Sequence, residues 1–359
     1  MSLRSLRFHS GAGLLFVLVV LGSGCAGTSP VADRQERLEQ ARTYSAEKAG
    51  DALLVCVWID GSLVLEAYQN GYDPEEPHAM TEISMLFPIL TILAADDAPD
   101  LDTPIADVFP EWDSSSAKSE ITLSQLLHFT SGLKPEGVGR GEIPTFGEAL
   151  SAPLVRPPGT SFRFGPTAIQ VLGSLMRKTS DVELMKDHFF LPLDIPGGRW
   201  QTVSGESPAA RSAELTPRLY DGAQLTAREL GRIGRLLLQD GRWNGKHVIE
   251  DVTPLTEPTA ASPGFGLGVW LNTDLRAADS AETASSFWKQ VPERLLLPRG
   301  QDRLIYDGAS VGLFMAAGRY NQRLYVFPSR RMVVVRLGRA DRTWSDAAFL
   351  ARLLDGKPL

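Results

Sequence analysis

Two stretches near opposite ends of the chain alternate between apolar and polar positions and predict β-strands. The first covers residues 52–72 (ALLVCVWIDGSLVLEAYQNGY) and is divided by Asp60-Gly61. Asp-Gly between two such runs predicts a tight hairpin, because both central residues of that turn need a positive φ. The second covers residues 323–338 (RLYVFPSRRMVVVRLG), where Pro328 begins the predicted turn. We expect both stretches to lie in one sheet.

Between these stretches the apolar residues follow a helical spacing. Three segments begin with a Thr or Pro start signal and run into Gly or polar residues, namely 122–132, 166–179 and 226–241. Thr226, with Glu229 three residues later, forms a capping-box pattern. A last helix is expected over 343–356, with Thr343 or Ser345 as its cap.

Strands at both chain ends and helices between them predict an α/β (α+β) fold. We expect a mixed, largely antiparallel sheet built from both chain ends, with flanking helices. The mostly helical middle, roughly residues 100–240, is expected to form an inserted subdomain, and a binding crevice to lie between the lobes. This domain is predicted over residues 51–359, which is long enough to bury a substantial core.

The first 25 residues follow the order of a secretory signal. Basic Arg4 and Arg7 precede the apolar run LLFVLVVLG, and small residues then lead to Cys25. The apolar run is too short to span a bilayer comfortably. The pattern resembles a bacterial lipobox with Cys25 as the lipidated residue, although Leu21 lies one place further from the cysteine than is usual. Simple cleavage is the alternative, and residues 26–50 are predicted to form a tether and a short helix.

A lipidated Cys25 would hold the protein to a membrane without inserting the chain into it. Ala26 after the cysteine resembles outer-membrane lipoproteins. We therefore expect a lipid-anchored protein on the periplasmic side, with the outer membrane favoured. The other cysteine, Cys56, lies in the run LLVCVWI. With Cys25 acylated no internal disulfide is possible, and Cys56 is predicted to be a small buried apolar residue.

Charge and histidine content exclude two classes of function. The chain has 36 Lys and Arg against 43 Asp and Glu, a formal net charge of −7. Binding to a phosphate backbone needs concentrated Lys and Arg, so no nucleic-acid partner is expected. The five histidines are scattered without the spacing of metal ligands. We expect neither a metal nor another cofactor.

Several stretches between residue 52 and the C-terminus resemble, in their order and spacing, one enzyme superfamily. They are LDTPIADVFPEW with ITLSQLLHFTSGL, PPGTSFRFGPTAIQVLGSLM, LTARELGRIGRLLLQDGRWNGKHVI, GFGLGVWLN and QRLYVFPSRRMVVVRLG. They resemble the serine β-lactamase and penicillin-binding-protein-like superfamily, especially its class C β-lactamase and esterase branch. The resemblance implies a serine hydrolase built on three motifs: Ser-x-x-Lys at a helix start, Tyr-x-Asn, and Lys- or His-x-Gly on an edge strand.

The first motif falls on Thr81 to Ser84, within MTEISMLFPILTILAADD. In the family the serine attacks a carbonyl and the lysine one helical turn away accepts its proton. Here Thr81 stands in the serine position and Ser84 in the lysine position. If the register slips, Ser84 becomes the nucleophile and Phe87 takes the lysine position, so neither register supplies a base. Glu82 is adjacent in sequence, but on a helix it points to another face.

The other two motifs are also changed. Phe164 stands in the tyrosine position and keeps the ring without the proton-carrying hydroxyl. Pro166 replaces the asparagine, whose amide holds substrate in the family. On the edge strand, Arg319 keeps a positive charge and Asn321 replaces the glycine that lets substrate approach.

Three changed motifs favour a catalytically inactive member of the superfamily, a pseudoenzyme carried by an envelope lipoprotein. Its crevice is expected to bind a cell-wall peptide or an envelope protein. Two other hypotheses stay open. One is an active serine hydrolase (an esterase, a peptidase or a β-lactamase-like enzyme) that uses Ser84 or Thr81 with an unfamiliar base. The other is an envelope scaffold without a ligand.

We predict that Cys25→Ala releases the protein from membranes. Attachment through several acyl chains at one cysteine is stable, whereas the polar tether alone has no membrane affinity. Membrane and soluble fractions, probed with an antibody, give the measurement. Cys56→Ala is the matched control and should stay with the membranes. Lipidation is not the anchor if Cys25→Ala fractionates like the wild type.

Overall fold

The structure is a computed structural model. It describes residues 15–16, 30–48, 53–69, 71–112, 117–135, 143–179, 185–196, 199–203, 216–275, 281–295, 297, 303–338 and 343–357. Within these ranges a seven-stranded sheet has the order β1-β3-β2-β12-β11-β10-β9, and its neighbouring strands pair antiparallel. The predicted α/β (α+β) fold with a largely antiparallel sheet is therefore confirmed.

Strands from both ends of the chain share this sheet, as the alternating pattern predicts. Its strands are β1 (Leu15–Phe16), β2 (Leu53–Ile59), β3 (Ser62–Tyr68), β9 (Trp270–Leu271), β10 (Phe314–Gly318), β11 (Gln322–Phe327) and β12 (Met332–Gly338). The β2–β3 hairpin turns at Asp60 and Gly61, whose φ values are 49° and 78°. Strand β12 pairs with β2, so that Val335 lies opposite Cys56. These pairings join the two ends of the domain directly.

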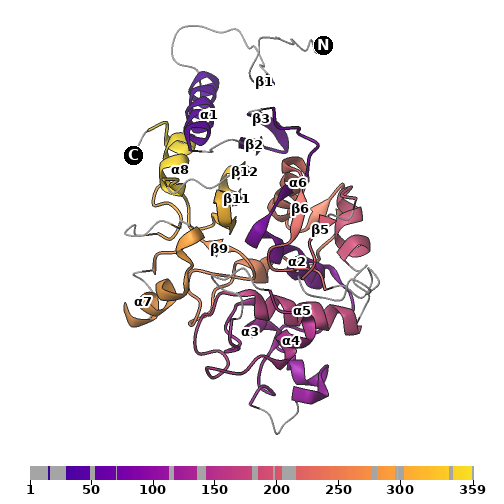
Figure 1. The fold of residues 1–359 in the computed structure, drawn as a ribbon. Helices are drawn as coiled ribbons and strands as arrows, with labels where there is room; N and C mark the ends of the chain where they lie inside the picture. The colour runs from indigo at the N-terminus through magenta and orange to yellow at the C-terminus, as the bar shows by residue number, and fades with distance from the viewer. Residues whose placement is uncertain are drawn as a thin grey trace.

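The helices cover both faces of the sheet and form a lower body (Figure 1). They are α1 (Pro30–Glu47), α2 (Leu86–Ala94), α3 (Leu123–Leu127), α4 (Phe146–Ser151), α5 (Pro166–Thr179), α6 (Ala227–Leu238), α7 (Ala281–Gln290) and α8 (Asp346–Asp355). In Figure 1, α1 and α8 lie beside the upper part of the sheet, whereas α3, α4 and α5 lie together below it. Among the described helices, none is both long and apolar enough to cross a bilayer.

Short elements link these helices and strands. The strands are β4 (His78–Ala79), β5 (Arg199–Trp200) and β6 (Ala223–Leu225), which form a small sheet, and the pair β7 (Arg242–Trp243) and β8 (Lys246–His247). The 3-10 turns are η1 (Thr81–Met85), η2 (Ile105–Asp107), η3 (Pro110–Trp112), η5 (Leu191–Leu193), η7 (Thr253–Thr256), η9 (Glu293–Leu295), η10 (Arg319–Asn321) and η11 (Pro328–Arg330), and η4 (Met185–Phe190) is a π-helix.

Two predicted helix starts are confirmed by their hydrogen bonds. Thr226 accepts from the Glu229 amide at the start of α6, and the Glu229 carboxylate accepts from the Thr226 amide in return. Ser345 rather than Thr343 caps α8, because its hydroxyl accepts from the Ala348 amide.

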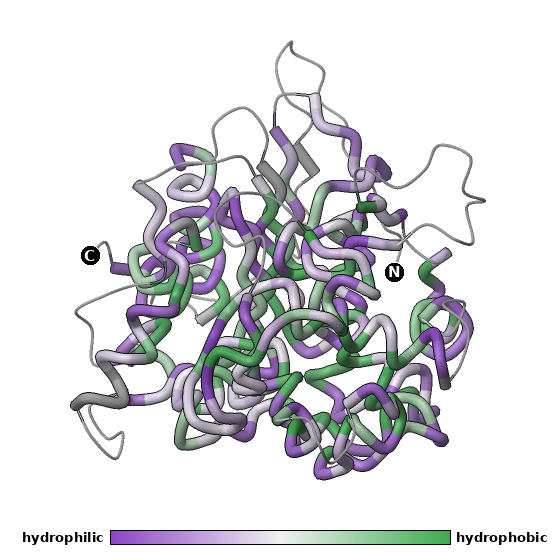
Figure 2. The backbone as a smooth tube through the Cα atoms, turned by 60° about the horizontal axis from the view of Figure 1, so that its bottom comes forward, coloured by the Kyte–Doolittle hydropathy of each residue, from purple (hydrophilic) through white to green (hydrophobic). Residues whose placement is uncertain are grey.

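Alternate side chains of β11 face opposite layers, which places α6 and α8 on different faces of the sheet. Leu324 faces α6, where a Cβ added to Gly234 would lie 2.7 Å from the Leu324 side chain. Tyr325 faces α8 and stacks on Phe349, with ring centroids 5.9 Å apart. Figure 2 shows hydrophobic segments, in green, running largely through the middle of the molecule.

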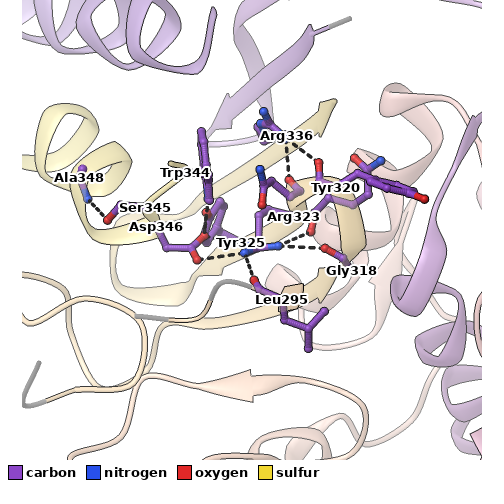
Figure 3. Close-up of polar contacts among 12 residues, drawn as sticks. Leu295, Gly318, Tyr320, Arg323, Tyr325, Arg336, Trp344, Ser345, Asp346 and Ala348 are labelled. Atoms are coloured by element: carbon purple, nitrogen blue, oxygen red, sulfur yellow. Dashed lines mark hydrogen bonds and ion pairs between the residues drawn. The ribbon is translucent and has the colours of Figure 1, made fainter. Parts of the chain in front are cut away.

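A buried ion pair joins β11 to α8 (Figure 3). Arg323 Nε donates to Asp346 at 2.7 Å, and both side chains are fully buried. Burial alone would lower the pKa of Arg323, but the Asp346 carboxylate raises it, so the guanidinium stays charged. The Tyr325 hydroxyl also donates to Asp346, and so does the Trp344 indole nitrogen at 3.1 Å. One carboxylate therefore accepts hydrogen bonds from three buried side chains.

We predict that Asp346→Ala lowers the free energy of unfolding by about 3–5 kcal/mol, because it leaves Arg323 buried and without its carboxylate. Urea unfolding followed by circular dichroism measures the change. Glu75→Ala is the matched control, since Glu75 pairs with Arg228 but its side chain is 75% exposed. Such an exposed pair contributes less than about 1 kcal/mol. Equal losses in the two variants would contradict this account of Asp346.

Candidate active site

The two hydroxyls at the position of the first motif are occupied by backbone groups. Thr81 opens η1 and is 3% exposed. Its hydroxyl donates to the Met80 carbonyl at 2.7 Å and lies 3.3 Å from the Arg319 carbonyl. Ser84 is fully buried, and its hydroxyl accepts from the Ala223 amide at 3.0 Å. Among the residues that the structure describes, neither hydroxyl forms a hydrogen bond with a group that could remove its proton.

Glu82, between these hydroxyls, binds the edge-strand motif. Its Oε2 accepts from the Arg319 backbone amide at 2.8 Å. Its Oε1 lies 3.2 Å from the Arg319 Nε, close enough for an ion pair although not aligned for a hydrogen bond. Glu82 is fully buried, whereas the Arg319 side chain is 28% exposed. The Glu82 carboxylate is therefore engaged by both the backbone amide and the side chain of Arg319.

Arg319 continues this contact into a chain of charges. Its Nη2 donates to Asp221 Oδ2 at 2.6 Å, and Arg218 forms two hydrogen bonds to the same carboxylate, at 2.9 and 2.8 Å. Burial tends to lower the pKa of Arg319, but Glu82 and Asp221 outweigh burial and raise the pKa overall. The order Glu82–Arg319–Asp221–Arg218 alternates in sign, and we call these four residues the site network.

The sequence did not indicate this network. The side chains of Thr81 and Glu82 both reach the backbone of Arg319, in the turn that follows β10. The elements that supply Arg319 and Asp221 lie far from Glu82 in sequence. The available signal was weak: Glu82 is a lone charge in an apolar segment, and Arg218 and Asp221 are three residues apart.

The tyrosine position lies in an aromatic cluster. Phe164 is buried and stacks on Phe129 with ring centroids 5.2 Å apart. Trp270 lies at 5.4 Å and Tyr220 at 5.8 Å from the Phe164 ring. A ring without a hydroxyl suits these apolar neighbours, and the position carries no proton relay. Pro166 is the first residue of α5, where its missing amide hydrogen would have had no partner within the helix.

Strand β10 ends in a tight turn against Thr81. A Cβ added to Gly318 would lie 2.1 Å from the Thr81 hydroxyl, so only glycine fits there. Tyr320 and Asn321 follow with left-handed φ values of 63° and 62°. Asn321 is 1% exposed and Tyr320 is 48% exposed. The structure thus brings Thr81 and Arg319 together, while Asn321 is buried behind the turn.

The turn is held by two buried arginines (Figure 3). Arg323 Nη1 donates to the Gly318 carbonyl at 3.1 Å. Arg336 Nη1 donates to the carbonyls of Tyr320 and Asn321, each at 3.0 Å. The guanidinium of Arg336 also lies over the Trp344 ring, 4.5 Å from its centroid. These bonds stabilise a backbone conformation that non-glycine residues rarely adopt.

Other catalytic chemistry has little support in the part of the chain that the structure describes. No group of three or more His, Cys, Asp or Glu side chains there could hold a metal ion. Cys56 is buried, as predicted, and its Sγ lies 4.0 Å from the Tyr68 hydroxyl. Burial, followed by the charge of Glu66, raises the pKa of the Cys56 thiol well above its usual range. Cys25, the predicted lipidation site, lies outside the described residues.

The profile of the Beta-lactamase family matches residues 36–355. The chain belongs to the beta-lactamase family. This confirms the resemblance drawn from the sequence. A search of curated proteins gives no match for this chain.

Solved structures of hydrolases share the beta-lactamase-family fold. A putative 6-aminohexanoate-dimer hydrolase from Bacillus anthracis is 20% identical, with a TM-score of 0.59 over 88% of this chain and 79% of that chain. EstCE1, a hydrolase with promiscuous acyltransferase activity, is 15% identical, with a TM-score of 0.63 over 90% and 99% of the two chains. A class C beta lactamase from Rhodobacter sphaeroides is 16% identical, with a TM-score of 0.59 over 90% and 99%. At these identities the likeness concerns the fold alone.

We predict that Cys56 does not react with a disulfide reagent such as dithionitrobenzoate while this beta-lactamase-family domain is folded. An ordinary thiol is half ionised at about pH 8.5. The raised pKa keeps Cys56 as the unreactive thiol at that pH. The assay uses Cys25→Ala, in which Cys56 is the remaining cysteine. Complete reaction in guanidinium chloride is the positive control, and rapid reaction of the folded protein would contradict the prediction.

Proposed function

We propose that this beta-lactamase-family protein is a pseudoenzyme of the cell envelope, anchored through Cys25. The observation that carries the catalytic part is the surroundings of Thr81. Its hydroxyl has two carbonyl oxygens as neighbours, and a carbonyl cannot act as a general base. General-base catalysis contributes roughly 10²- to 10⁴-fold to rate, so a hydroxyl without a base is a weak nucleophile.

The site network supports the same proposal. It places ion pairs beside Thr81, where the family has a base and a substrate-binding group. Thr81, Ser84 and Phe164 are each 3% exposed or less. The position of the relay tyrosine carries no hydroxyl. The alternative of an active hydrolase that uses Ser84 has less support, because the Ser84 hydroxyl already accepts a backbone hydrogen bond.

As the binding partner, we favour an envelope protein over a cell-wall peptide. A peptide in the crevice would have to reach Thr81 or displace Arg319 from Glu82 and Asp221. Removing one partner from a buried ion pair is strongly unfavourable. An envelope protein that binds the outer surface requires neither change. The anchoring part rests on the N-terminal sequence.

Reaction with a fluorescent penicillin and with a fluorophosphonate tests the catalytic part. We expect no labelled residue in the wild-type protein by mass spectrometry, while a class C β-lactamase run in parallel is labelled to completion. Stoichiometric label at Thr81 or Ser84 in the wild type, lost in Thr81→Val or Ser84→Ala, would overturn the proposal.

A restored site gives the complementary test. Thr81→Ser with Ser84→Lys rebuilds the nucleophile and its base, and Phe164→Tyr returns the phenol. We expect slow but measurable penicillin labelling at residue 81 in this triple variant. The matched control replaces Ser84→Lys by Ser84→Met, which has a similar length without the amine, and should show no label. Equal labelling of the two variants would mean that the amine is not the base.

A further inference from the structure

A cavity of about 460 Å³ lies away from the site network, between the C-terminal end of α6, the turn η7, the end of β9 and the beginning of β10. Phe314, the first residue of β10, lines it, whereas Gly318, the last residue, lies at the Thr81 turn. Gly318 is four positions after Phe314 along the strand, which is roughly 13 Å. The cavity and the family site are therefore at opposite ends of one strand.

Most of the cavity wall is apolar and firmly packed. Its apolar members are Leu237, Val252, Leu255, Pro258, Leu271, Val311, Leu313, Phe314 and Pro328. Leu255 and Leu313 are 1% exposed and belong to the main core, so the floor is part of the rigid body. Val311 is 67% exposed, an uncommon value for a large apolar side chain. The volume of this mostly apolar cavity is within the range of small-molecule sites.

The polar part of the wall carries one charge. Thr253, Thr256 and Thr273 supply neutral hydroxyls, and Asp240 is the sole ionisable residue of the lining. No ion pair within the described part of the chain includes Asp240. Asp240 has a left-handed φ of 51° just after α6, a conformation that aspartate tolerates. The cavity thus combines an apolar floor with one carboxylate that no cation neutralises.

We propose that this cavity binds a small amphipathic cation, with an apolar body of phenylalkyl size and an amine that reaches Asp240. The volume and the apolar floor accommodate the body. The charge of the lining selects the head group, because the exposed Asp240 carboxylate attracts a cation and repels an anion. Neither the catalytic nor the anchoring part of the proposed function enters this inference.

Three probes that differ only in the head group test the charge preference: 4-phenylbutylamine, 4-phenylbutanol and 4-phenylbutyrate. Titrations followed by methyl NMR of the leucines and valines measure each dissociation constant. We expect the amine to bind about 3- to 5-fold tighter than the alcohol, as an exposed ion pair provides, and about 10-fold tighter than the carboxylate. Higher salt should reduce both ratios.

Asp240→Asn keeps the left-handed conformation and removes the charge. We expect it to bring the three probes to within about 2-fold of one another. The proposal is overturned if the carboxylate binds the wild type as tightly as the amine, if no probe binds, or if Asp240→Asn leaves the preference for the amine unchanged.

Gly312→Leu tests the location. Gly312 lines the cavity, an added Cβ would meet no atom within 4 Å, and its φ is not left-handed, so a side chain can enter the open space without strain. We expect at least 10-fold weaker binding of the amine. Gly147→Leu is the matched control, since Gly147 on α4 is equally open and is not part of this cavity. Unchanged binding in Gly312→Leu would place the probe elsewhere and overturn the proposal.

Size-exclusion chromatography at the same protein concentrations tests whether a second copy of the chain occupies the cavity instead. If the exposed Val311 side and its cavity joined two copies of the chain, the wild type would elute as a dimer and Gly312→Leu as a monomer, and the proposal would be wrong. We expect the same elution volume for both.

Discussion

Two like charges stand directly opposite each other in the middle of the sheet, and the rest of the structure depends on how they are compensated. Arg323 on β11 is the register partner of Arg336 on β12, and both side chains are fully buried. Like charges in opposite positions destabilise a strand pair. Asp346 neutralises Arg323, while Arg336 is met by three carbonyl oxygens and the face of Trp344. Each arginine is compensated by residues of specific neighbouring elements, so the positions of the sheet, α8 and the end of α1 depend on one another.

The same two arginines determine the shape of the candidate site. Three of their hydrogen bonds go to carbonyls of the turn at residues 318–321 and stabilise its left-handed backbone. This turn presents the Arg319 amide and guanidinium to Glu82. The site network is thus supported from behind by core residues, and it is a specific, rigid arrangement rather than a loosened remnant.

The fold could be predicted from the sequence because its signals are local and several of them agree. Asp60-Gly61, the Thr226 capping box and the alternation in residues 323–338 each specify one element, and all agree with the resemblance to the family. The candidate site could be predicted only in part. Thr81, Phe164 and Arg319 were found as motif positions, but the partner of Arg319 depends on a contact between segments 237 residues apart. Periodicity carries no information on such a contact.

The backbone at Glu82 differs from the α-helix start that the motif alignment implies. An α-helix starting at Thr81 would turn the next side chain toward solvent or a neighbouring helix, whereas the chain forms a 3-10 turn there before α2 begins at Leu86. The tighter turn and the left-handed φ of Thr81 direct Glu82 to β10. Such backbone departures follow from tertiary contacts and are not encoded in local propensity.

The alternating signs of the site network have an evolutionary consequence. Changing Glu82 alone leaves Arg319 with one carboxylate fewer, and changing Arg319 alone leaves Glu82 buried without its cation. Each single step passes through a less stable protein, although a joint change could be tolerated. The four residues therefore constrain one another in evolution, so that Glu82 and Arg319 are expected to change together rather than one at a time.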